Sequence, residues 1–301
     1  MGELRTIVIC GATGRLGGAV LHSFHQKGNW NIIALSRNVN GARARIIKKK
    51  GVQVLQADLV DKDSLVKAFK GAYGVFGVTM PVNLKGKIDT SIELEQGKNI
   101  IEACAETNIR HLILSTVIVH KEGQETTLGY VKSKALLEKY ADEKGVPNTV
   151  MRPATFLDEI GGDFMPLKKG FYTGMLDADA KMLHLSCRDF GKIAAIMFDH
   201  PEKWIGKKQN LAGDFVSGNE IVAILNDLYP RIKFKYHVPT LLLMQLFARE
   251  WIPLRKHLEN WGRPPYLASI EQTIKETRNI LPDTMNTEDY LHYSGWDVKF
   301  Y

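Results

Sequence analysis

Short apolar runs alternate with amphipathic helical patterns through the first half of the chain. Six runs are short, aliphatic and bounded by glycine or polar residues, so they are typical of strands. They cover residues 6–10, 30–35, 52–56, 74–78, 111–115 and 148–151. Between them, apolar positions recur at helical spacing, most clearly over residues 63–70 and 92–107. This alternation predicts a doubly wound α/β fold, in which a parallel sheet is covered on both faces by right-handed crossovers.

The pattern changes after residue 156, where glycines and aromatic residues replace the regular alternation. Helical spacing returns over residues 189–200 and 218–229, with a further strand predicted at 209–211. We therefore expect residues 1–155 and 186–230 to form the parallel-sheet domain. Residues 156–185 and 231–301 are expected to form a second, smaller, discontinuous α+β cap domain.

The first predicted strand leads directly into a glycine-patterned turn, Gly11-Ala-Thr-Gly14-Arg-Leu-Gly17. In a dinucleotide site the first glycine allows a tight turn, the second lets the backbone approach a pyrophosphate, and the third lets the helix pack on the sheet. The amides at the start of that helix then face the phosphates. The turn thus predicts a Rossmann domain that binds a nicotinamide cofactor through Gly11, Thr13, Gly14, Arg15, Leu16 and Gly17.

The end of the second strand favours NADP over NAD. An NAD site usually has an acidic residue here, which holds the ribose 2′-hydroxyl. This chain has Ser36 and Arg37 instead, and a guanidinium matches the geometry of a 2′-phosphate. Arg37 is the leading phosphate ligand, with Ser36 and Asn38 as helpers, and Arg15 could reach the same group. An ordinary loop arginine is the alternative interpretation.

Two further strand ends are expected to contact the cofactor. Asp58 and Leu59 follow the third strand, where the adenine would lie. Asp58 either accepts a hydrogen bond from the base or caps the helix that begins near Lys62. The fourth strand closes near the middle of the cofactor with Thr79, Met80 and Pro81.

Tyr130 and Lys134 are candidate catalytic residues, because a spacing of four places both on one helix face. In a dehydrogenase such a lysine holds the nicotinamide ribose and lowers the pKa of the phenol, so that the tyrosine can donate a proton to a carbonyl. Ser115, at the end of the fifth strand, could orient that carbonyl. Tyr140 and Lys144 have the same spacing but lie at the far end of the helix, and a surface tyrosine is the alternative for Tyr130.

An ordered set of motifs resembles the NmrA-like family, which includes redox-sensing transcriptional regulators, quinone reductases and isoflavone-reductase relatives. The set comprises the glycine turn, Ser36-Arg37-Asn38, Ala57-Asp58-Leu59, Leu114-Ser115-Thr116, Lys134, Arg152-Pro153-Ala154-Thr155-Phe156, Arg188-Asp189-Phe190-Gly191, Pro201-Glu202-Lys203 and Leu211-Ala212-Gly213. The resemblance implies an NADP-binding Rossmann domain and a small carboxyl-terminal domain. Arg152 and Pro153 would line the nicotinamide, Thr155 would contact the cofactor, and Phe156 would lie behind the nicotinamide or against the substrate. A rigid strand-to-loop turn is the alternative. In this family the lysine is common, whereas the tyrosine is often replaced in sensor-like members.

Composition and charge limit the remaining possibilities. The 301 residues are 45% apolar and 24% charged, and the formal net charge of +7 suits an anionic ligand. The densest basic stretch, residues 43–50, reads as a short helix with a solvated face, and no nucleic-acid-binding motif accompanies it. Three dispersed cysteines predict neither a disulfide framework nor a metal site. No membrane span or secretory signal is predicted, so a cytoplasmic location is expected.

Two functional hypotheses follow. The first is an NADP(H)-dependent reductase that transfers hydride to a quinone, an enone or another carbonyl-bearing small molecule. The second is a non-catalytic NADP(H)-binding redox sensor that regulates a protein partner. Glu93, Glu95 and Lys98 lie on the long helix before the fifth strand and read as either a solvated face or a homodimer contact.

Overall fold

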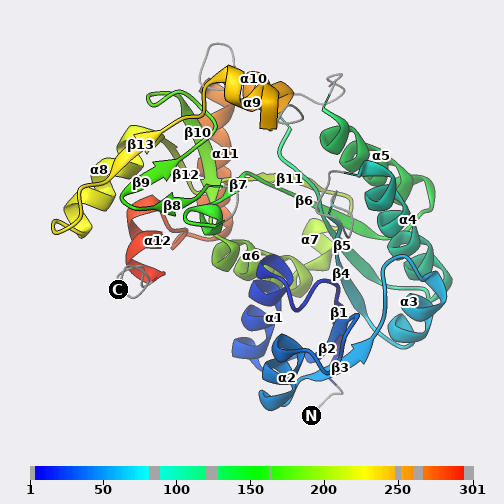
Figure 1. Cartoon of the computed structure of the whole chain (residues 1–301). Coiled ribbons are helices and arrows are strands. Elements are labelled where there is room, and N and C mark those ends of the chain that lie inside the picture. The colour runs from blue at the N-terminus through cyan, green and yellow to red at the C-terminus, as the bar shows by residue number, and fades with distance from the viewer. Residues whose placement is uncertain are drawn as a thin grey trace. The chain divides into compact units, whose positions relative to one another are not determined.

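The computed structural model describes residues 4–80, 89–119, 128–162, 165–247, 252–259 and 267–294 (Figure 1). Contacts between residues divide the chain into two compact units. Unit 1 comprises Met1–Val119, Gln124–Arg152 and Phe190–Asn210, and unit 2 comprises His120–Gly123, Pro153–Asp189 and Leu211–Tyr301. Within the described residues, no helix is both long enough and apolar enough to cross a membrane.

Unit 1 is built on a seven-stranded sheet with the order β11-β6-β5-β4-β1-β2-β3. Its strands are β1 (Thr6–Ile9), β2 (Asn31–Ser36), β3 (Gln53–Gln56), β4 (Gly74–Val78), β5 (His111–Ser115), β6 (Asn148–Pro153) and β11 (Lys208–Leu211). The pairs from β3 through to β6 are parallel. The strand order reverses at β1, which lies between β2 and β4, and ligands of doubly wound sheets bind at the carboxyl ends of the strands beside such a reversal.

Helices cover both faces of this sheet (Figure 1). They are α1 (Arg15–Lys27), α2 (Ala42–Lys49), α3 (Lys62–Phe69), α4 (Thr90–Glu106), α5 (Gly129–Glu143), α6 (Cys187–Asp199) and α7 (Pro201–Trp204). Helix α4 packs between α3 and α5. These helices share an apolar cluster with the sheet that includes Cys10, Ile100, Cys104, Leu112 and Leu137. The predicted doubly wound Rossmann architecture is confirmed, since the apolar runs form parallel strands and the helical patterns form the crossovers.

Helices α4 and α5 approach each other closely at Gly97. A Cβ atom built at this glycine would lie 2.4 Å from the side chain of Leu137 on α5. A side chain at position 97 would therefore require the Leu137 side chain to move. This contact sets the spacing of the two helices that carry Glu93 and Lys134.

Unit 2 contains two small three-stranded sheets, with the orders β12-β10-β7 and β13-β9-β8. The strands are β7 (Thr155–Phe156), β8 (Leu167–Lys168), β9 (Phe171–Thr173), β10 (Lys181–Leu185), β12 (Asp214–Ser217) and β13 (Lys235–His237). The helices are η1 (Leu157–Glu159), α8 (Gly218–Leu228), α9 (Leu241–Phe247), α10 (Ile252–Glu259), α11 (Leu267–Ile280) and α12 (Thr287–Tyr293). This is the expected mixture of short strands and helices that is discontinuous in sequence.

Three described segments expected in the Rossmann domain fall in unit 2, namely residues 153–155, 186–189 and 211–230. Helix α8 forms as predicted, but Ile221 and Leu225 pack with Phe234, Tyr290 and Leu291 in the core of unit 2. The helical pattern in sequence showed an apolar face without showing which core that face would enter. The division into two functional domains stays a prediction.

Candidate active site

The glycine turn after β1 has the tight geometry that its spacing predicts. Gly11 adopts a φ of +64°, and the Gly14 amide donates to the Gly11 carbonyl at 2.8 Å. A Cβ atom at Gly17 would lie 2.3 Å from that carbonyl oxygen and 2.7 Å from the carbonyl oxygen of Cys10. Because both neighbours are backbone atoms, no side chain fits there. This turn, residues 11–17, is the glycine cradle, and its third glycine lets α1 pack closely against the end of β1, as in a dinucleotide-binding turn.

Helix α1 begins at this cradle without a side-chain cap. Its N-cap is Gly14, and the first turn contains no acidic residue. The first amides of a helix carry partial positive charge and have no intrahelical acceptor, so this end favours an anion. Gly14 and Arg15 are exposed, and Thr13 and Leu16 are half-buried.

Ser36 and Arg37, at the end of β2, differ in role. The hydroxyl of Ser36 is buried and exchanges hydrogen bonds with the backbone of Asn38, at 3.0 and 3.2 Å, so it holds the turn. Arg37 and Asn38 are exposed. Arg37 stays the predicted ligand of a 2′-phosphate.

Arg43 is a residue of this region that the sequence reasoning missed. It lies in the first turn of α2, and its Nη1 atom donates to the carbonyl oxygen of Thr13 at 2.9 Å. Its guanidinium therefore lies against the glycine turn instead of pointing only to solvent. The sequence feature that could have indicated this contact is the position of Arg43 at the amino end of the helix that follows the Ser36–Arg37 turn.

The structure excludes one of the two roles considered for Asp58. Asp61 is the N-cap of α3 and accepts from the Ser64 amide at 3.2 Å, so the interpretation of Asp58 as that cap is wrong. Asp58 accepts from the amide of Val60 within its own turn at 3.3 Å. The carbonyl of Leu59 accepts from Asn99 Nδ2 at 2.9 Å, which ties this turn to α4. Contact of Asp58 and Leu59 with an adenine stays a prediction.

Lys134 is buried at the carboxyl end of β4. Its Nζ atom donates to Oγ1 and to the carbonyl oxygen of Thr79, at 2.8 and 3.0 Å, and forms an ion pair with Glu93 Oε1 at 2.8 Å. The structure thus brings together Lys134 and Thr79, two of the predicted cofactor-binding residues. Met80 is exposed, and Pro81 lies outside the described residues.

Glu93 is the unexpected member of this cluster. It is fully buried, and besides Lys134 it accepts hydrogen bonds from the hydroxyls of Thr79 and Ser133. It is therefore neither part of a solvated face nor available to a homodimer contact. A signal was present in the sequence, since Glu93 lies at helical spacing from Gly97, Ile100 and Ile101 and so on the apolar face of α4.

Tyr130 lies one helical turn before Lys134, but its pKa is raised and not lowered. Burial of the phenol raises the pKa above the ordinary value. The expected lowering of this pKa by Lys134 is not seen in this arrangement, in which the lysine's ammonium binds Glu93 and Thr79, and proton donation by Tyr130 stays a prediction. Ser115 is buried at the end of β5. Tyr140, the other tyrosine with a lysine four residues later, donates its hydroxyl hydrogen to Glu102 at 2.6 Å.

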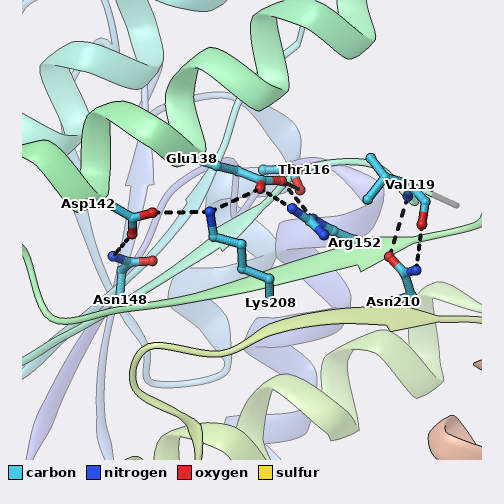
Figure 2. Close-up of polar contacts among 8 residues, drawn as sticks. All are labelled: Thr116, Val119, Glu138, Asp142, Asn148, Arg152, Lys208 and Asn210. Carbon is cyan, nitrogen blue, oxygen red and sulfur yellow. Dashed lines mark hydrogen bonds and ion pairs between the residues drawn. The ribbon is translucent and has the colours of Figure 1, made fainter. Parts of the chain in front are cut away.

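A buried polar network fixes α5 to the sheet (Figure 2). Arg152, in β6, donates to both carboxylate oxygens of Glu138, with Nε to Oε1 at 3.0 Å. Thr116 donates its hydroxyl to Oε1 of the same carboxylate at 2.8 Å, and Lys208 lies 3.7 Å from Oε2. Glu138 is one helical turn beyond Lys134, so β6, β11 and the residue after β5 together hold the helix that carries the candidate residues.

The same network explains the position of Arg152, which the sequence placed at the nicotinamide. Its guanidinium is buried and bound to Glu138, and this carboxylate was missed because its partner is distant in sequence. Asn210 in β11 adds a contact with the backbone of Val119, accepting from its amide at 3.4 Å and donating to its carbonyl at 2.6 Å. Figure 2 shows this contact beside the network. The segment that follows Ser115 is thereby held to the sheet.

Pro153, Thr155 and Phe156 lie in unit 2. Pro153 ends β6 and is buried, while Thr155 and Phe156 form β7, which pairs with β10. Their contact with a nicotinamide or a substrate stays a prediction.

A parallel sheet with a glycine cradle at its strand-order reversal defines the class of Rossmann-fold dinucleotide-site proteins. Within that class the chain belongs to the NmrA-like family, whose model matches residues 3–291. The resemblance found in the sequence motifs is thus confirmed.

Individual proteins extend the likeness. An NmrA-like family domain-containing oxidoreductase, FrzB of Cladobotryum sp., is 27% identical over 246 residues, which is 72% of this chain and 71% of that protein. The crystal structure of NmrA, a negative transcriptional regulator, in complex with NADP has a TM-score of 0.76 at 16% identity and covers 99% of this chain and 97% of its own. The NADPH-dependent quinone oxidoreductase QOR2 of Escherichia coli, complexed with NADPH, has a TM-score of 0.72 at 19% identity, covering 97% and 99%. Both structural likenesses support the fold.

Proposed function

We propose that this protein is an NADP(H)-dependent reductase that transfers hydride to a quinone, an enone or another carbonyl-bearing small molecule. The observation that carries the proposal is the glycine cradle after β1 together with a buried lysine at the end of the neighbouring strand β4. The names of FrzB, an oxidoreductase, and QOR2, an NADPH-dependent quinone oxidoreductase, support it.

The residues present fit NADP(H) along its length. The glycine turn and the amino end of α1 would bind the pyrophosphate, and Arg37 and Arg43 the 2′-phosphate. Lys134 would bind the nicotinamide ribose by exchanging one of its two donations to Thr79, while it keeps its ion pair with Glu93. The reduced nicotinamide supplies the hydride when bound.

Tyr130 has a limited role in this proposal. Because burial raises its pKa, the phenol keeps its proton at neutral pH and can donate a hydrogen bond to a carbonyl oxygen. An acceptor that gains hydride also needs a proton at oxygen, and Tyr130 and Ser115 are the proposed groups on this side.

The first test measures cofactor binding and turnover together. Purified protein is titrated with NADPH and NADH, and a panel of quinones and enones is then added while the absorbance of the reduced nicotinamide is followed. We expect a preference for NADPH and turnover that falls in Tyr130→Phe and Lys134→Ala. Tyr140→Phe is the matched control, since Tyr140 has the same spacing to a lysine but binds Glu102. Undiminished turnover in both site variants contradicts the mechanism.

A redox sensor is the second candidate, and one observation favours it. Lys134 is already satisfied by Glu93 and Thr79, and the phenol is not activated, so cofactor binding need not lead to chemistry. NmrA, whose fold this chain shares, is a transcriptional regulator solved with NADP. A sensor binds NADPH tightly without oxidising it across the acceptor panel, and its affinity for a protein partner changes between cofactor-free and cofactor-saturated states. Equal partner affinity in the two states excludes it.

A further inference from the structure

The Lys134–Glu93 ion pair joins two crossover helices inside unit 1. Glu93 lies in the first turn of α4 and Lys134 in α5, and their exposed fractions are 0% and 7%. A lone ammonium at such a depth is strongly disfavoured, because burial costs a charged group much of its hydration. The carboxylate is therefore what allows a charged lysine to stay at this position.

Glu93 is itself held in place by three donors. Thr79 donates to Oε1 at 3.2 Å, Ser133 donates to Oε2, and Lys134 pairs with Oε1 at 2.8 Å. Thr79 also accepts from Lys134, so the three side chains close a ring of hydrogen bonds at the end of β4. The ring fixes the direction of the lysine as well as its charge.

Other charged groups near Lys134 have their own partners. Glu138, one turn further along α5, is bound by Arg152 and lies 3.7 Å from Lys208. Tyr130, one turn before, is a neutral phenol with a raised pKa. Burial lowers the pKa of Lys134, and Glu93 is the group that opposes this lowering through its charge and its hydrogen bond.

We propose that Glu93 is the positioning residue of Lys134: its buried carboxylate keeps the ammonium charged and directed along the end of β4, and NADPH binding depends on Glu93 through this lysine alone. The inference rests on the proposed function, because Lys134 is taken to bind the nicotinamide ribose. It adds a second residue, on a different helix, to the requirements of the cofactor site.

The test is the pH dependence of NADPH affinity, measured by fluorescence in Glu93→Gln. The amide has nearly the shape of the carboxylate but no charge, so the lysine loses the group that maintains its protonation. We expect the dissociation constant of Glu93→Gln to rise more steeply between pH 7 and pH 9 than that of the unmodified protein, because loss of the carboxylate lowers the charged fraction of Lys134 at alkaline pH. Glu95→Gln, an exposed change two residues along α4, is the matched control and is expected to follow the unmodified protein.

Two further variants separate charge from packing. Glu93→Asp retains the charge and is expected to keep the pH profile of the unmodified protein, and Glu93→Gln/Lys134→Met is expected to lose the added pH dependence. Should Glu93→Gln fail to fold, recovery of folding in the double variant shows that the defect comes from the unpaired lysine. Failure of the double variant as well overturns the proposal, because the carboxylate then serves packing only.

The outcomes also separate this inference from the proposed function. If the unmodified protein does not bind NADPH, the proposed function fails first. If it binds NADPH and Lys134→Ala weakens binding, while Glu93→Gln follows the control at every pH, the cofactor site stands and the role of Glu93 is refuted.

Discussion

Replacing Arg152 by methionine tests whether the Glu138 network holds α5. The Arg152 and Glu138 side chains are each only 5% exposed. Removing one partner of a buried ion pair leaves an uncompensated charge and typically costs about 3–5 kcal/mol. Thr116 and Lys208 remain near the carboxylate, so we expect Arg152→Met to lower the free energy of unfolding by about 3 kcal/mol, the lower end of that range.

Urea unfolding followed by circular dichroism measures this loss, and the same helix supplies the control. Lys139 and Glu143 form an ion pair at 3.4 Å with side chains 74% and 56% exposed, so Lys139→Ala is expected to cost no more than about 0.5 kcal/mol. The double variant Arg152→Met/Glu138→Leu removes both buried charges and is expected to regain most of the loss. A cost for Arg152→Met as small as that of Lys139→Ala refutes the argument that this network fixes the helix.

Three further predictions concern the cofactor site and the folded state. Gly17→Ala forces a Cβ atom against two carbonyl oxygens, so we expect the free energy of unfolding in urea to fall by about 1–3 kcal/mol. We also expect this variant to lose NADPH binding, measured by calorimetry. Full NADPH binding would contradict the assignment of the glycine cradle to the cofactor. Arg37→Glu is expected to weaken NADPH binding by about tenfold to a hundredfold, the loss of one charge-assisted hydrogen bond, without weakening NADH; an equal effect on both cofactors makes Arg37 an ordinary loop residue. Burial lowers the pKa of His111 and of His184 to about 4, so the unfolded chain binds more protons than the folded chain as pH falls from about 6.5 to 4. The free energy of unfolding should therefore decrease over this window by up to about 3 kcal/mol for each histidine, and a flat profile in urea titrations at several pH values contradicts it.

The Rossmann part of the fold was predictable because its signals are local. Each strand is a short apolar run, each crossover has its own helical period, and the conformation of Gly11 and the space at Gly17 follow from a few neighbouring residues. The assignment of α8 was less secure, since an amphipathic helix shows that it has a core-facing side but not which core receives it. The expected cytoplasmic location and homodimer stay predictions.

The site was predictable only where one segment determines it. Lys134 and Thr79 were singled out from their own strand and helix, and the structure brings them together. Glu93 was assigned to the surface because its partner, Lys134, lies on another helix. The sequence alone does not show whether a charged residue on an apolar helix face has a buried partner. Arg43 was missed for the same reason, since its contact with Thr13 spans two elements.

The close approach of α4 and α5 at Gly97 has a consequence for sequence variation in the family. The helix spacing depends jointly on the sizes of residues 97 and 137, and that spacing also fixes how far Glu93 lies from Lys134. A relative with alanine at the position of Gly97 is therefore expected to have a residue smaller than leucine opposite it, or else to lack the acidic partner of the lysine. Positions 97 and 137 are therefore expected to covary with positions 93 and 134 across related sequences.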